Sequence, residues 1–434
     1  MIKAIVKKIT PRFVLKTYHY CWAFFSALFY LFPSRKMIII GITGTNGKST
    51  TVDMVSKILI AAGYKTASLS SLRFQINDRI WQNRLKMTMP GRFAIQKFLH
   101  QAKKNRCKYV VLETTSEGIK QHRHKFIDYD VAVITNLKPE HIESHGSFEN
   151  YKTAKGKLFQ SLSKTKKKKG VDKISVVNLD DENAKYFLHF KADKKWGYGL
   201  KDSLIEADEK LIAKNINTIY PQTKFFLNNK EIVINFLGEF NVLNTLAAIS
   251  VCLSQGIDLD LIIKVLKNIE GVSGRMEAVS KEPLVFVDFA HTPDALEAIH
   301  RAIKPLKRGN VICVLGSCGG GRDKWKRPEM GRISNQNCDR IILTNEDPYD
   351  ENPESILDQI EKGIDSKEKL ERILDRKEAI KRALQIAKNE DIVLITGKGS
   401  EPLMCLANGQ KIPWDDREIV RQELNKIHEN KRNI

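Results

Sequence analysis

The stretch from residue 37 to 63 constrains the fold more than any other part of the chain. It reads MIIIGITGTNGKSTTVDMVSKILIAAG, an apolar β-branched run, a glycine-rich turn and then apolar residues at helical spacing. This order predicts a strand, a loop and a helix, in which Gly44 and Gly47 let backbone amides approach a polyphosphate. Lys48 adds a positive charge, and the Ser49 hydroxyl suits Mg²⁺. We interpret the stretch as a phosphate-binding loop, although it is not a literal G-x-x-x-x-G-K-[ST] match, because Ile42 stands five residues before Gly47.

Length and charge bound the number of domains and the kind of partner. The chain has 434 residues, which exceeds the size at which single cores stop growing, so we expect two or three domains. Its formal net charge of +21 favours anionic partners: nucleotides, acidic substrates, membrane surfaces or nucleic acid. No module that interleaves basic and aromatic residues appears, so we expect no nucleic-acid partner.

The seven cysteines are scattered along the chain. They form no C-x-x-C pair and their count is odd, which argues against a disulfide framework and against a zinc ribbon. We therefore expect all of them to be thiols in a reducing compartment.

Residues 1–36 combine a basic start with an uncharged run centred on CWAFFSALFYLF, and Arg35 and Lys36 close the segment. A secretory signal is disfavoured, because no small-residue cleavage site follows and export would carry a nucleotide site out of the cell. Three interpretations stay open: a helix packed on the next domain, an interfacial helix on a membrane, and a true membrane span.

Two polar side chains follow buried strands after the loop. Glu113 ends an apolar run over 109–112, and a carboxylate at the carboxyl end of a parallel strand beside a phosphate loop can hold Mg²⁺ directly or through water. His141 follows a second strand, over 131–134. On its own, His141 also suits a loop histidine with satisfied hydrogen bonds.

Lys155 lies on the apolar face of a helix that we expect over 147–162. Burying a bare ammonium is costly unless the group is paired or chemically changed. One interpretation lets the stem of Lys155 run over the apolar stripe with its amine in water. The other sends the amine into a polar active site. The stripe consists of Phe148, Tyr151, Leu158, Phe159 and Leu162.

The last third of the chain alternates strands with helices, which predicts a second, mostly parallel sheet. The turn at 271–274 is the best candidate boundary. The fold class is therefore α/β, with a central P-loop ATPase domain with a parallel-rich sheet over 37–272 and a C-terminal Rossmann-like α/β domain over 273–434. The expected strands of the second sheet are 284–287, 311–315, 340–343 and 392–395.

Taken together, these pieces resemble the Mur ligase family, the ATP-dependent amide-forming enzymes of peptidoglycan precursor synthesis. The resemblance is greatest to the branch that adds the third residue, usually a diamino acid, to UDP-N-acetylmuramoyl-L-alanyl-D-glutamate. It runs from about residue 38 to 425 through TGTNGKST (43–50), ETTS (113–116), TNLKPEH (135–141), HGSFENYKTAKGKLF (145–159), GEFNVLN (238–244), SGRME (273–277), DFAHTPD (288–294), GKGSE (397–401) and PWDDRE (413–418).

The resemblance implies a role for each matching residue. Lys48, Lys155 and His291 would be catalytic, with His291 near the acyl-phosphate. Lys155 would be carbamylated, an N-carboxylated and therefore anionic side chain that binds a second Mg²⁺. The metal ligands would be Ser49, Glu113, His141 and Lys155. The nucleotide-binding residues would be Gly44, Thr45, Asn46, Gly47, Lys48, Ser49, Thr50, Asn241, Asn244, Arg275 and Asp288. The substrate-binding residues would be Thr88, Ser116, Gln121, Arg123, Glu346, Asp347 and Glu401.

The chemistry that the resemblance implies follows from charge. A carboxylate would attack the γ-phosphate of ATP to give an acyl-phosphate, and the amine of the incoming amino acid would displace phosphate, while Mg²⁺ and cationic side chains neutralise the crowded anions. The expected partners are small molecules, a UDP-muramoyl-peptide-like acceptor and an amino acid, with no specific protein partner. We expect a cytoplasmic protein, with peripheral contact to the inner membrane face through residues 1–36 left open.

The chain differs from the family pattern at two informative places. Residues 1–36 stand where the family has its N-terminal UDP-binding domain, which leaves open how the uridine end is held. Glu346-Asp347-Pro348-Tyr349 replaces the Asp-Asn-Pro-Arg of diaminopimelate-adding enzymes. Without the arginine that clamps the distal carboxylate, another amino acid becomes plausible.

Two other functions compete with this interpretation. A folylpolyglutamate-synthase-like ligase shares the loop and the chemistry, although the 145–159 and 397–401 blocks fit the Mur branch better. A non-catalytic nucleotide-binding relative that serves as a scaffold is disfavoured by the intact set of Lys48, Glu113, His141 and Lys155.

Overall fold

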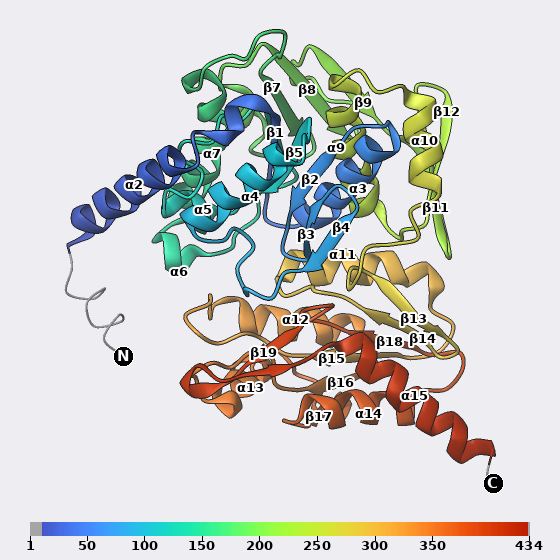
Figure 1. Ribbon diagram of the computed structural model, residues 1–434. Coiled ribbons are helices and arrows are strands. Elements are labelled where there is room, and N and C mark those ends of the chain that lie inside the picture. The colour runs from blue at the N-terminus through green and yellow to red at the C-terminus, as the bar shows by residue number, and fades with distance from the viewer. Residues whose placement is uncertain (1–10, 433–434) are drawn as a thin grey trace.

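The computed structural model describes residues 11–432, which form two α/β bodies and one projecting helix (Figure 1). The first body is built around a nine-stranded sheet and the second around a six-stranded sheet. The projecting helix, α2 (Arg12–Phe29), precedes the first body. Within residues 11–432, no helix combines the length and the apolar character that crossing a bilayer requires. The predicted α/β fold, with a P-loop domain and a second Rossmann-like domain, is confirmed.

The first sheet has the strand order β4-β3-β2-β5-β1-β6-β7-β8-β9, and its strands from β2 to β9 in that order run parallel. Strands with both faces covered by helices are apolar throughout, which is why β1, β5 and β6 were readable from the sequence. The strands are β1 (Ile38–Thr43), β2 (Thr66–Leu69), β3 (Arg73–Ile76), β4 (Arg79–Gln82), β5 (Tyr109–Glu113), β6 (Val131–Ile134), β7 (Ile174–Asn178), β8 (Lys194–Gly199) and β9 (Glu209–Ile212).

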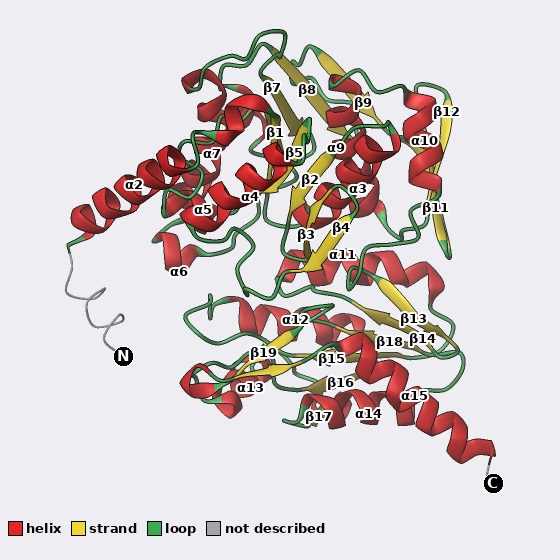
Figure 2. Ribbon diagram, in the orientation of Figure 1, coloured by secondary structure: helices red, strands yellow, loops and turns green. Residues whose placement is uncertain are grey.

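Helices cover both faces of this sheet, as the secondary-structure colouring in Figure 2 shows. One face packs on α3 (Lys48–Ala61), α9 (Glu239–Ser254), α10 (Leu259–Lys267) and the small sheet of β10 (Lys214–Ile219), β11 (Gln222–Leu227) and β12 (Lys230–Ile234). The other face packs on α4 (Arg92–Lys104), α5 (Ser116–Lys120), α7 (Phe148–Lys164) and α8 (Ala184–Leu188). A short helix, α6 (Ile142–His145), precedes α7.

The second sheet has the order β13-β14-β18-β15-β16-β17 and is parallel except for the edge pair β13 and β14. Its strands are β13 (Glu277–Lys281), β14 (Leu284–Val287), β15 (Val311–Leu315), β16 (Arg340–Leu343), β17 (Leu370–Arg372) and β18 (Ile392–Ile395), beside the small pair β19 (Leu403–Cys405) and β20 (Lys411–Pro413). Its helices are α11 (Pro293–Ile303), α12 (Lys326–Asn337), α13 (Pro353–Glu361), α14 (Arg376–Ile386) and α15 (Asp416–Arg432). The four predicted strands are confirmed to the residue. Single turns of 3₁₀ helix occur at η1 (Pro33–Lys36), η2 (Lys304–Leu306), η3 (Lys367–Lys369) and η4 (Ala407–Gly409).

The expectation that all the cysteines are thiols was wrong. Cys313 on β15 and Cys338 after α12 form a disulfide. Lys168, in the segment after α7, points inward and donates to the fully buried Asp130. Both contacts join segments that are distant in the sequence, and local patterns do not record such contacts.

Candidate active site

The phosphate-binding loop joins β1 to α3 and is held by the segment that follows β6. The backbone N–H of Thr45 donates to the carbonyl of Asn136 (2.9 Å), and that of Asn46 donates to Oδ1 of Asn136 (2.9 Å). Gly47 has φ +81°, and a Cβ there would collide with Oδ1 of Asn244. The loop therefore depends on glycine both for its backbone conformation and for the close approach of a neighbouring helix.

Lys48, at the start of α3, lies inside this loop. Its Nζ donates to the carbonyl of Thr45 at 2.9 Å. Burial lowers the pKa of Lys48, and the nearby Glu113 carboxylate opposes that shift. Thr50, in the first turn of the same helix, is buried as well.

Ser49 and Glu113 form a hydrogen-bonded pair beside the loop. The Ser49 hydroxyl donates to Oε2 of Glu113 at 2.8 Å, and the same carboxylate accepts from the backbone N–H (2.8 Å) and the hydroxyl (3.1 Å) of Ser71. The hydroxyl of Ser71 also contacts that of Thr88 at 2.7 Å. A hydrogen-bonded chain therefore links the metal-binding candidates Ser49 and Glu113 to the substrate-binding candidate Thr88.

Lys155 extends from α7 into the same region. Its side chain is 1% exposed, and its Nζ donates to the carbonyl of Gly44 at 2.6 Å and lies 4.6 Å from the centre of the Tyr151 ring. Burial and the neighbouring Lys48 lower the pKa of Lys155 well below its usual value, against the influence of Glu113 and Glu140. The side chain therefore reaches the phosphate-binding loop, and the interpretation with its amine in water is wrong.

His141 lies next to Tyr151, with ring centres 6.1 Å apart. Burial, together with the cationic Arg322, lowers the pKa of His141 well below 6.5. The imidazole is therefore neutral near pH 7, which is the state that a metal ligand requires.

The donor set formed by Ser49, Glu113 and His141 fits a hard cation such as Mg²⁺. Glu113 is 1% exposed, yet within residues 11–432 it forms no ion pair with a lysine or arginine, so a bound cation would balance its charge. Lys155 fits the set only if its amine becomes an anionic group.

The remaining nucleotide-binding candidates flank the loop on two sides. On α9, Asn244 donates to Oδ1 of Asn241 at 3.2 Å. From the second body, the carboxylate of Asp288 accepts from the backbone N–H groups of Met276 and Ala290, both at 2.6 Å. Arg275 lies over the ring of Phe289 at 4.2 Å, and burial lowers its pKa while Asp288 and Glu113 oppose the shift. Strand ends of both bodies therefore meet at the loop.

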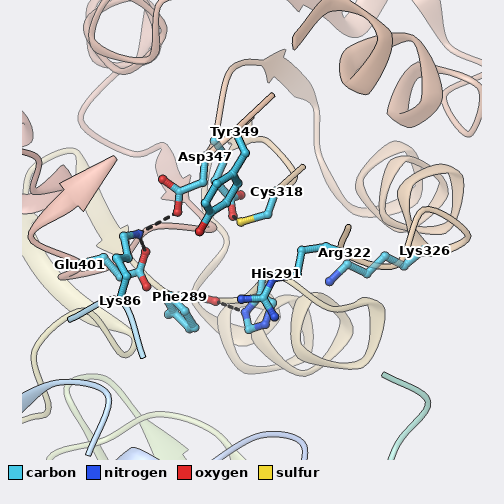
Figure 3. A pocket seen from close by; sticks show the side chains of 10 residues that line it. Lys86, Phe289, His291, Cys318, Arg322, Lys326, Asp347, Tyr349 and Glu401 are labelled. Carbon is cyan, nitrogen blue, oxygen red and sulfur yellow. Dashed lines mark hydrogen bonds and ion pairs between the residues drawn. The ribbon is translucent and has the colours of Figure 1, made fainter. Parts of the chain in front are cut away.

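A pocket opens between the two bodies, and Figure 3 shows the side chains that line it. Lys86, from the loop after β4, donates to Asp347 at 2.7 Å and also to Glu401. The fully buried Lys398 donates to the same two carboxylates at 2.9 and 2.8 Å. The pocket is lined by Lys86, Phe289, His291, Cys318, Arg322, Lys326, Glu346, Asp347, Tyr349 and Glu401.

Glu346 adds a third carboxylate to this pocket. It is 1% exposed, and its Oε1 accepts from the thiol of Cys318 at 3.0 Å, whereas its Oε2 has no hydrogen-bond partner among residues 11–432. Burial raises the pKa of Glu346, and the cationic Arg376 opposes the shift. Glu346 therefore offers a buried acceptor to a ligand in the pocket.

His291 lies on the side of the pocket that holds Arg322 and Lys326 (Figure 3). Its Nδ1 is 2.9 Å from the carbonyl of Phe289, and its ring meets that of Phe289 edge to face at 4.7 Å between centres. Burial and the charge of Lys326 lower the pKa of His291 well below 6.5. The contact that orients this neutral imidazole is therefore with the backbone carbonyl of Phe289 and not with a carboxylate.

Three acceptor-binding candidates form a separate group around α5. Ser116 is buried at its first residue, and Arg123 donates to Oε1 of Gln121 at 2.8 Å and to the carbonyl of Met89. Arg92 donates to the carbonyl of Gln121 at 2.5 Å. The predicted residues thus divide into a loop group, an interdomain pocket and this α5 group.

Sequence reasoning missed several residues that the structure brings to these groups. Ser71 and Lys86 lie in loops without periodicity, and no motif marks them. Lys326 is buried and donates to Glu140 across the two bodies at 3.1 Å. A signal for this surface is present in the sequence, because polar residues follow the four predicted strands of the second sheet and ligands bind at that edge of open α/β sheets.

Comparison with known proteins places this architecture in a family. Residues 42–252 match the model of the Mur ligase middle domain, and residues 274–399 match that of the Mur ligase glutamate ligase domain. The chain is 36% identical over 410 residues to UDP-N-acetylmuramoyl-L-alanyl-D-glutamate--2,6-diaminopimelate ligase of Syntrophomonas wolfei, covering 93% of this chain and 81% of the relative. It is also 36% identical to the ligase of the same name from Bacillus cereus, over 91% of this chain and 80% of the relative.

Solved structures agree with this relationship. A structure of UDP-N-acetylmuramoyl-L-alanyl-D-glutamate--2,6-diaminopimelate ligase superimposes with a TM-score of 0.60 at 30% identity, covering 90% of this chain and 79% of that chain. Folylpolyglutamate synthase of Mycobacterium tuberculosis has a TM-score of 0.69 at 16% identity over 87% of this chain and 92% of that chain, which shows a shared fold. The phosphate-binding loop, the paired domains and these relatives together show that the chain belongs to the Mur ligase family of ATP-dependent ligases.

Proposed function

We propose that this ligase joins an amino acid, a diamino acid by preference, to a UDP-N-acetylmuramoyl-dipeptide-like acceptor in peptidoglycan synthesis. The observation that carries the proposal is the placement of Lys155, whose amine contacts the phosphate-binding loop beside Ser49 and Glu113. The names of the relatives, which are ligases for 2,6-diaminopimelate, support the acceptor and the class of amino acid. The reaction would take place in the cytoplasm, and the segment over residues 1–36, of which the structure describes residues 11–36, would contact the inner face of the membrane.

The reaction proceeds by two displacements at carbonyl and phosphoryl centres. A carboxylate oxygen of the acceptor attacks the γ-phosphorus of ATP, the bond to the bridging oxygen breaks, and ADP leaves with that bond's electron pair. The neutral amine of the amino acid then attacks the acyl carbon, inorganic phosphate leaves, and the amine nitrogen gives up a proton as the amide forms. Both steps bring anions together, so cationic side chains around the phosphates lower the barrier.

Each residue group has a defined task in this scheme. Lys48 and the loop amides bind the phosphates of ATP, and Arg275 and Asp288 approach the nucleotide from the second body. Asn241 and Asn244 would contact adenine, and Asp288 the ribose. Mg²⁺ held by Ser49, Glu113 and His141 would neutralise phosphate charge and polarise the γ-phosphoryl group. His291, which lines the pocket between the bodies, would hydrogen-bond to the reacting acyl group.

We propose that Lys155 is carbamylated in the active enzyme. A neutral amine attacks CO₂ and loses one proton to give an N-carboxylate, and the lowered pKa of Lys155 keeps its amine neutral. The product carries a negative charge beside Lys48, where a bare ammonium would be repelled. It would supply a further oxygen ligand to the metal site.

The pocket between the bodies would bind the amino acid. Asp347 and Glu401 are already paired with Lys86 and Lys398, whereas Oε2 of Glu346 accepts no hydrogen bond within residues 11–432. A second ammonium on the amino acid would therefore complement Glu346. Glu401 would hold the attacking amino group. Tyr349 lines the same pocket and offers no charge to a distal carboxylate, so a diamino acid with a single carboxylate also fits.

Phosphate release from ATP tests the proposal directly. The assay combines UDP-N-acetylmuramoyl dipeptide with diaminopimelate, lysine, ornithine and alanine in turn. We expect turnover to require both acceptor and amino acid, and Lys155→Ala to lower kcat by at least about 100-fold. Lys164→Ala, on the same helix but exposed, should leave kcat unchanged. Turnover that ignores the acceptor and Lys155 would show that the proposed reaction is wrong.

A spectroscopic experiment tests carbamylation separately. After incubation with ¹³C-bicarbonate, the wild type should show a carbamate ¹³C resonance that the Lys155→Ala variant lacks. An active wild type without that resonance would refute carbamylation and leave the ligase reaction in place.

A further inference from the structure

Helix α2 and the residues just after it expose a large apolar surface, of which the rest of residues 11–432 contacts only the edges. More than half of the exposed large apolar side chains of the described residues belong to this one segment. Phe13 and Phe29 are each 71% exposed and Leu31 is 74% exposed. Contiguous apolar patches of this kind usually mark a binding surface. The α2 surface consists of Phe13, Val14, Tyr18, Tyr20, Trp22, Phe24, Phe25, Leu28, Phe29 and Leu31.

The opposite side of α2 is fixed to the first body. Ala23, Ser26 and Ala27 are buried at this contact, and their small side chains let the helix lie close against the body. Ring contacts at the edges secure it, with Tyr20 and Phe24 on Phe126 at 5.2 and 5.3 Å between ring centres. Trp22 packs edge to face on Phe93 at 5.6 Å. These contacts set the orientation of the α2 surface relative to the first body, beside which α2 lies and from which it projects (Figure 1).

Cationic side chains surround this aromatic surface. Lys16 on α2 is exposed, as is Lys157 on α7, and Lys125 lies in the loop that carries Phe126. Burial lowers the pKa of Lys157, and the charges of Lys16 and Lys125 lower it further, so the three amines lie within electrostatic range of one another. We call Lys16, Lys125 and Lys157 the cationic group. Asp128, the nearest acidic residue of that loop, is engaged by Arg35 at 3.5 Å.

We propose that the α2 surface and the cationic group dock the protein on an anionic lipid bilayer, with α2 lying in the plane of the interface. Tryptophan and tyrosine favour the boundary between head groups and acyl chains, and lysines beside them attract anionic head groups. A second copy of this chain is a poorer occupant, because a symmetric contact would bring two cationic groups together. An anionic bilayer satisfies the aromatic and the cationic side chains at once.

Docking in this orientation places the acceptor side of the active site at the membrane, a step that rests on the proposed function. The ring of Tyr20 lies 6.0 Å from that of His122, which stands between the acceptor-binding candidates Gln121 and Arg123. Arg92, which donates to the carbonyl of Gln121, begins the helix on which α2 packs. The α5 group would therefore face the lipid head groups, and the acceptor would enter along the membrane surface.

Vesicle flotation with the full chain tests the docking. We expect the wild type to float with vesicles of phosphatidylglycerol and phosphatidylcholine, and to float much less with phosphatidylcholine alone. Phe13→Ser combined with Phe25→Ser should weaken binding to the anionic vesicles at least about tenfold, because both rings leave the interface. Leu204→Ser combined with Ile219→Ser is the matched control, since these exposed apolar residues lie outside the α2 surface.

Charge reversal tests the second half of the proposal. Lys16→Glu combined with Lys125→Glu should weaken binding to anionic vesicles at least about tenfold and reduce its salt dependence. Lys264→Glu combined with Lys267→Glu, on the exposed side of α10, should not. ATP turnover with the soluble acceptor should survive in all four variants, which shows that they fold. Because flotation does not require turnover, a failed ligase assay leaves this test intact.

Site-specific labelling tests the orientation. Among the free cysteines of the described residues only Cys21 is exposed, and it lies on α2, so an environment-sensitive dye there should shift to the blue when anionic vesicles are added. A dye at Lys120→Cys, beside the acceptor-binding candidates, should report lipid as well, whereas one at Lys230→Cys on β12 should not. The proposal would be overturned if the wild type did not float, or if the serine variant and the control variant bound vesicles equally. It would also be overturned if the wild type formed a concentration-dependent dimer that Phe13→Ser abolishes and did not bind vesicles.

Discussion

At the scale of single residues, buried charges define this protein's chemistry. Lys155 and Glu113 are each 1% exposed, and both lie beside the phosphate-binding loop. Burying ionised groups is unfavourable unless they are paired or bind an ion. Their burial is therefore unfavourable for stability by itself, and the proposed ligands, ATP and a divalent cation, would account for it.

Two glycines with the same backbone conformation allow a controlled test of the loop. Gly47 has φ +81° and Gly63 has φ +84°, but a Cβ would collide with Asn244 only at Gly47, whereas nothing lies within 4 Å at Gly63. We expect either alanine variant to lose about 1 to 2 kcal/mol of stability through left-handed strain. Gly47→Ala should in addition weaken ATP binding at least tenfold, as measured by calorimetry. Equal ATP affinity in the two variants would contradict this account of the loop.

His124 predicts how stability depends on pH. Burial lowers its pKa to about 3, and its Nδ1 has no hydrogen-bond partner in the part of the chain that the structure describes. As the pH falls below about 6.5, the unfolded chain binds a proton that the folded protein does not, so the free energy of unfolding falls until about pH 3. At about pH 5 the loss from this residue is on the order of 2 kcal/mol.

Replacement of the imidazole should remove that loss. We expect His124→Phe to lose about 2 kcal/mol less than the wild type between about pH 7 and pH 5, as measured by urea unfolding. An identical slope in the two proteins would show that His124 is not a source of acid sensitivity.

At the scale of elements, a buried network of ion pairs and hydrogen bonds around Asp130 joins the beginnings of neighbouring strands. Asp130, just before β6, is fully buried and accepts from the backbone N–H of Ile39 at 2.9 Å, from Lys173 at 3.1 Å and from Lys168. It therefore connects the starts of two neighbouring strands to the segment that leads into β7. The metal-binding candidates follow β1, β5 and β6, so their relative positions depend on how these strands are aligned with one another.

Removal of Asp130 should be severe. Asp130→Ala leaves two ammonium groups near the core without their counter-charge, and we expect a loss of about 3 to 5 kcal/mol. Asp172→Ala removes an exposed partner of Lys167 and should cost less than about 1 kcal/mol. Chemical denaturation of both variants measures the difference, and comparable losses would mean that the Asp130 network adds little.

At the scale of the whole molecule, the two bodies meet through polar contacts that close the active site. Asp323, in the loop after β15, accepts from the backbone N–H groups of Ile142 and Glu143 at 3.1 and 3.0 Å. Lys326 reaches Glu140, and Lys86 reaches Asp347 and Glu401 in the opposite direction. Polar interfaces of this kind are readily opened, which suits an enzyme that admits substrates and releases products.

Loss of one of these contacts should favour the open arrangement. Asp323→Ala removes two charge-assisted hydrogen bonds, and we expect a larger radius of gyration in solution scattering and a kcat that falls more than ATP affinity. The exposed Asp365 provides a charge-matched control, and Asp365→Ala should match the wild type in both measurements. If Asp323→Ala keeps the wild-type radius and kcat, this contact does not hold the bodies together.

The sequence by itself determined the local elements and the family. An apolar run, a glycine-rich turn and helical spacing of apolar residues predicted β1, the phosphate-binding loop and α3. Short apolar runs predicted β14, β15, β16 and β18. The placement of Lys155 on the apolar face of α7 followed from helical periodicity, which assigns side chains to faces without reference to the rest of the chain. The direction of its amine was left open by the sequence and was decided by the contact with Gly44. Roles for individual residues came from resemblance and remain proposals.

Only the tertiary structure decided which distant groups meet. Lys86 and Glu401 are 315 positions apart, and Ser71 and Glu113 are 42 apart, yet each pair forms part of the candidate site. The same holds for the Cys313–Cys338 disulfide and for the aromatic contacts that hold α2 against the first body. Periodicity predicts which face of a helix or strand a residue occupies. Which residue it then contacts depends on how the sheets and domains pack, and that packing depends on the chain as a whole.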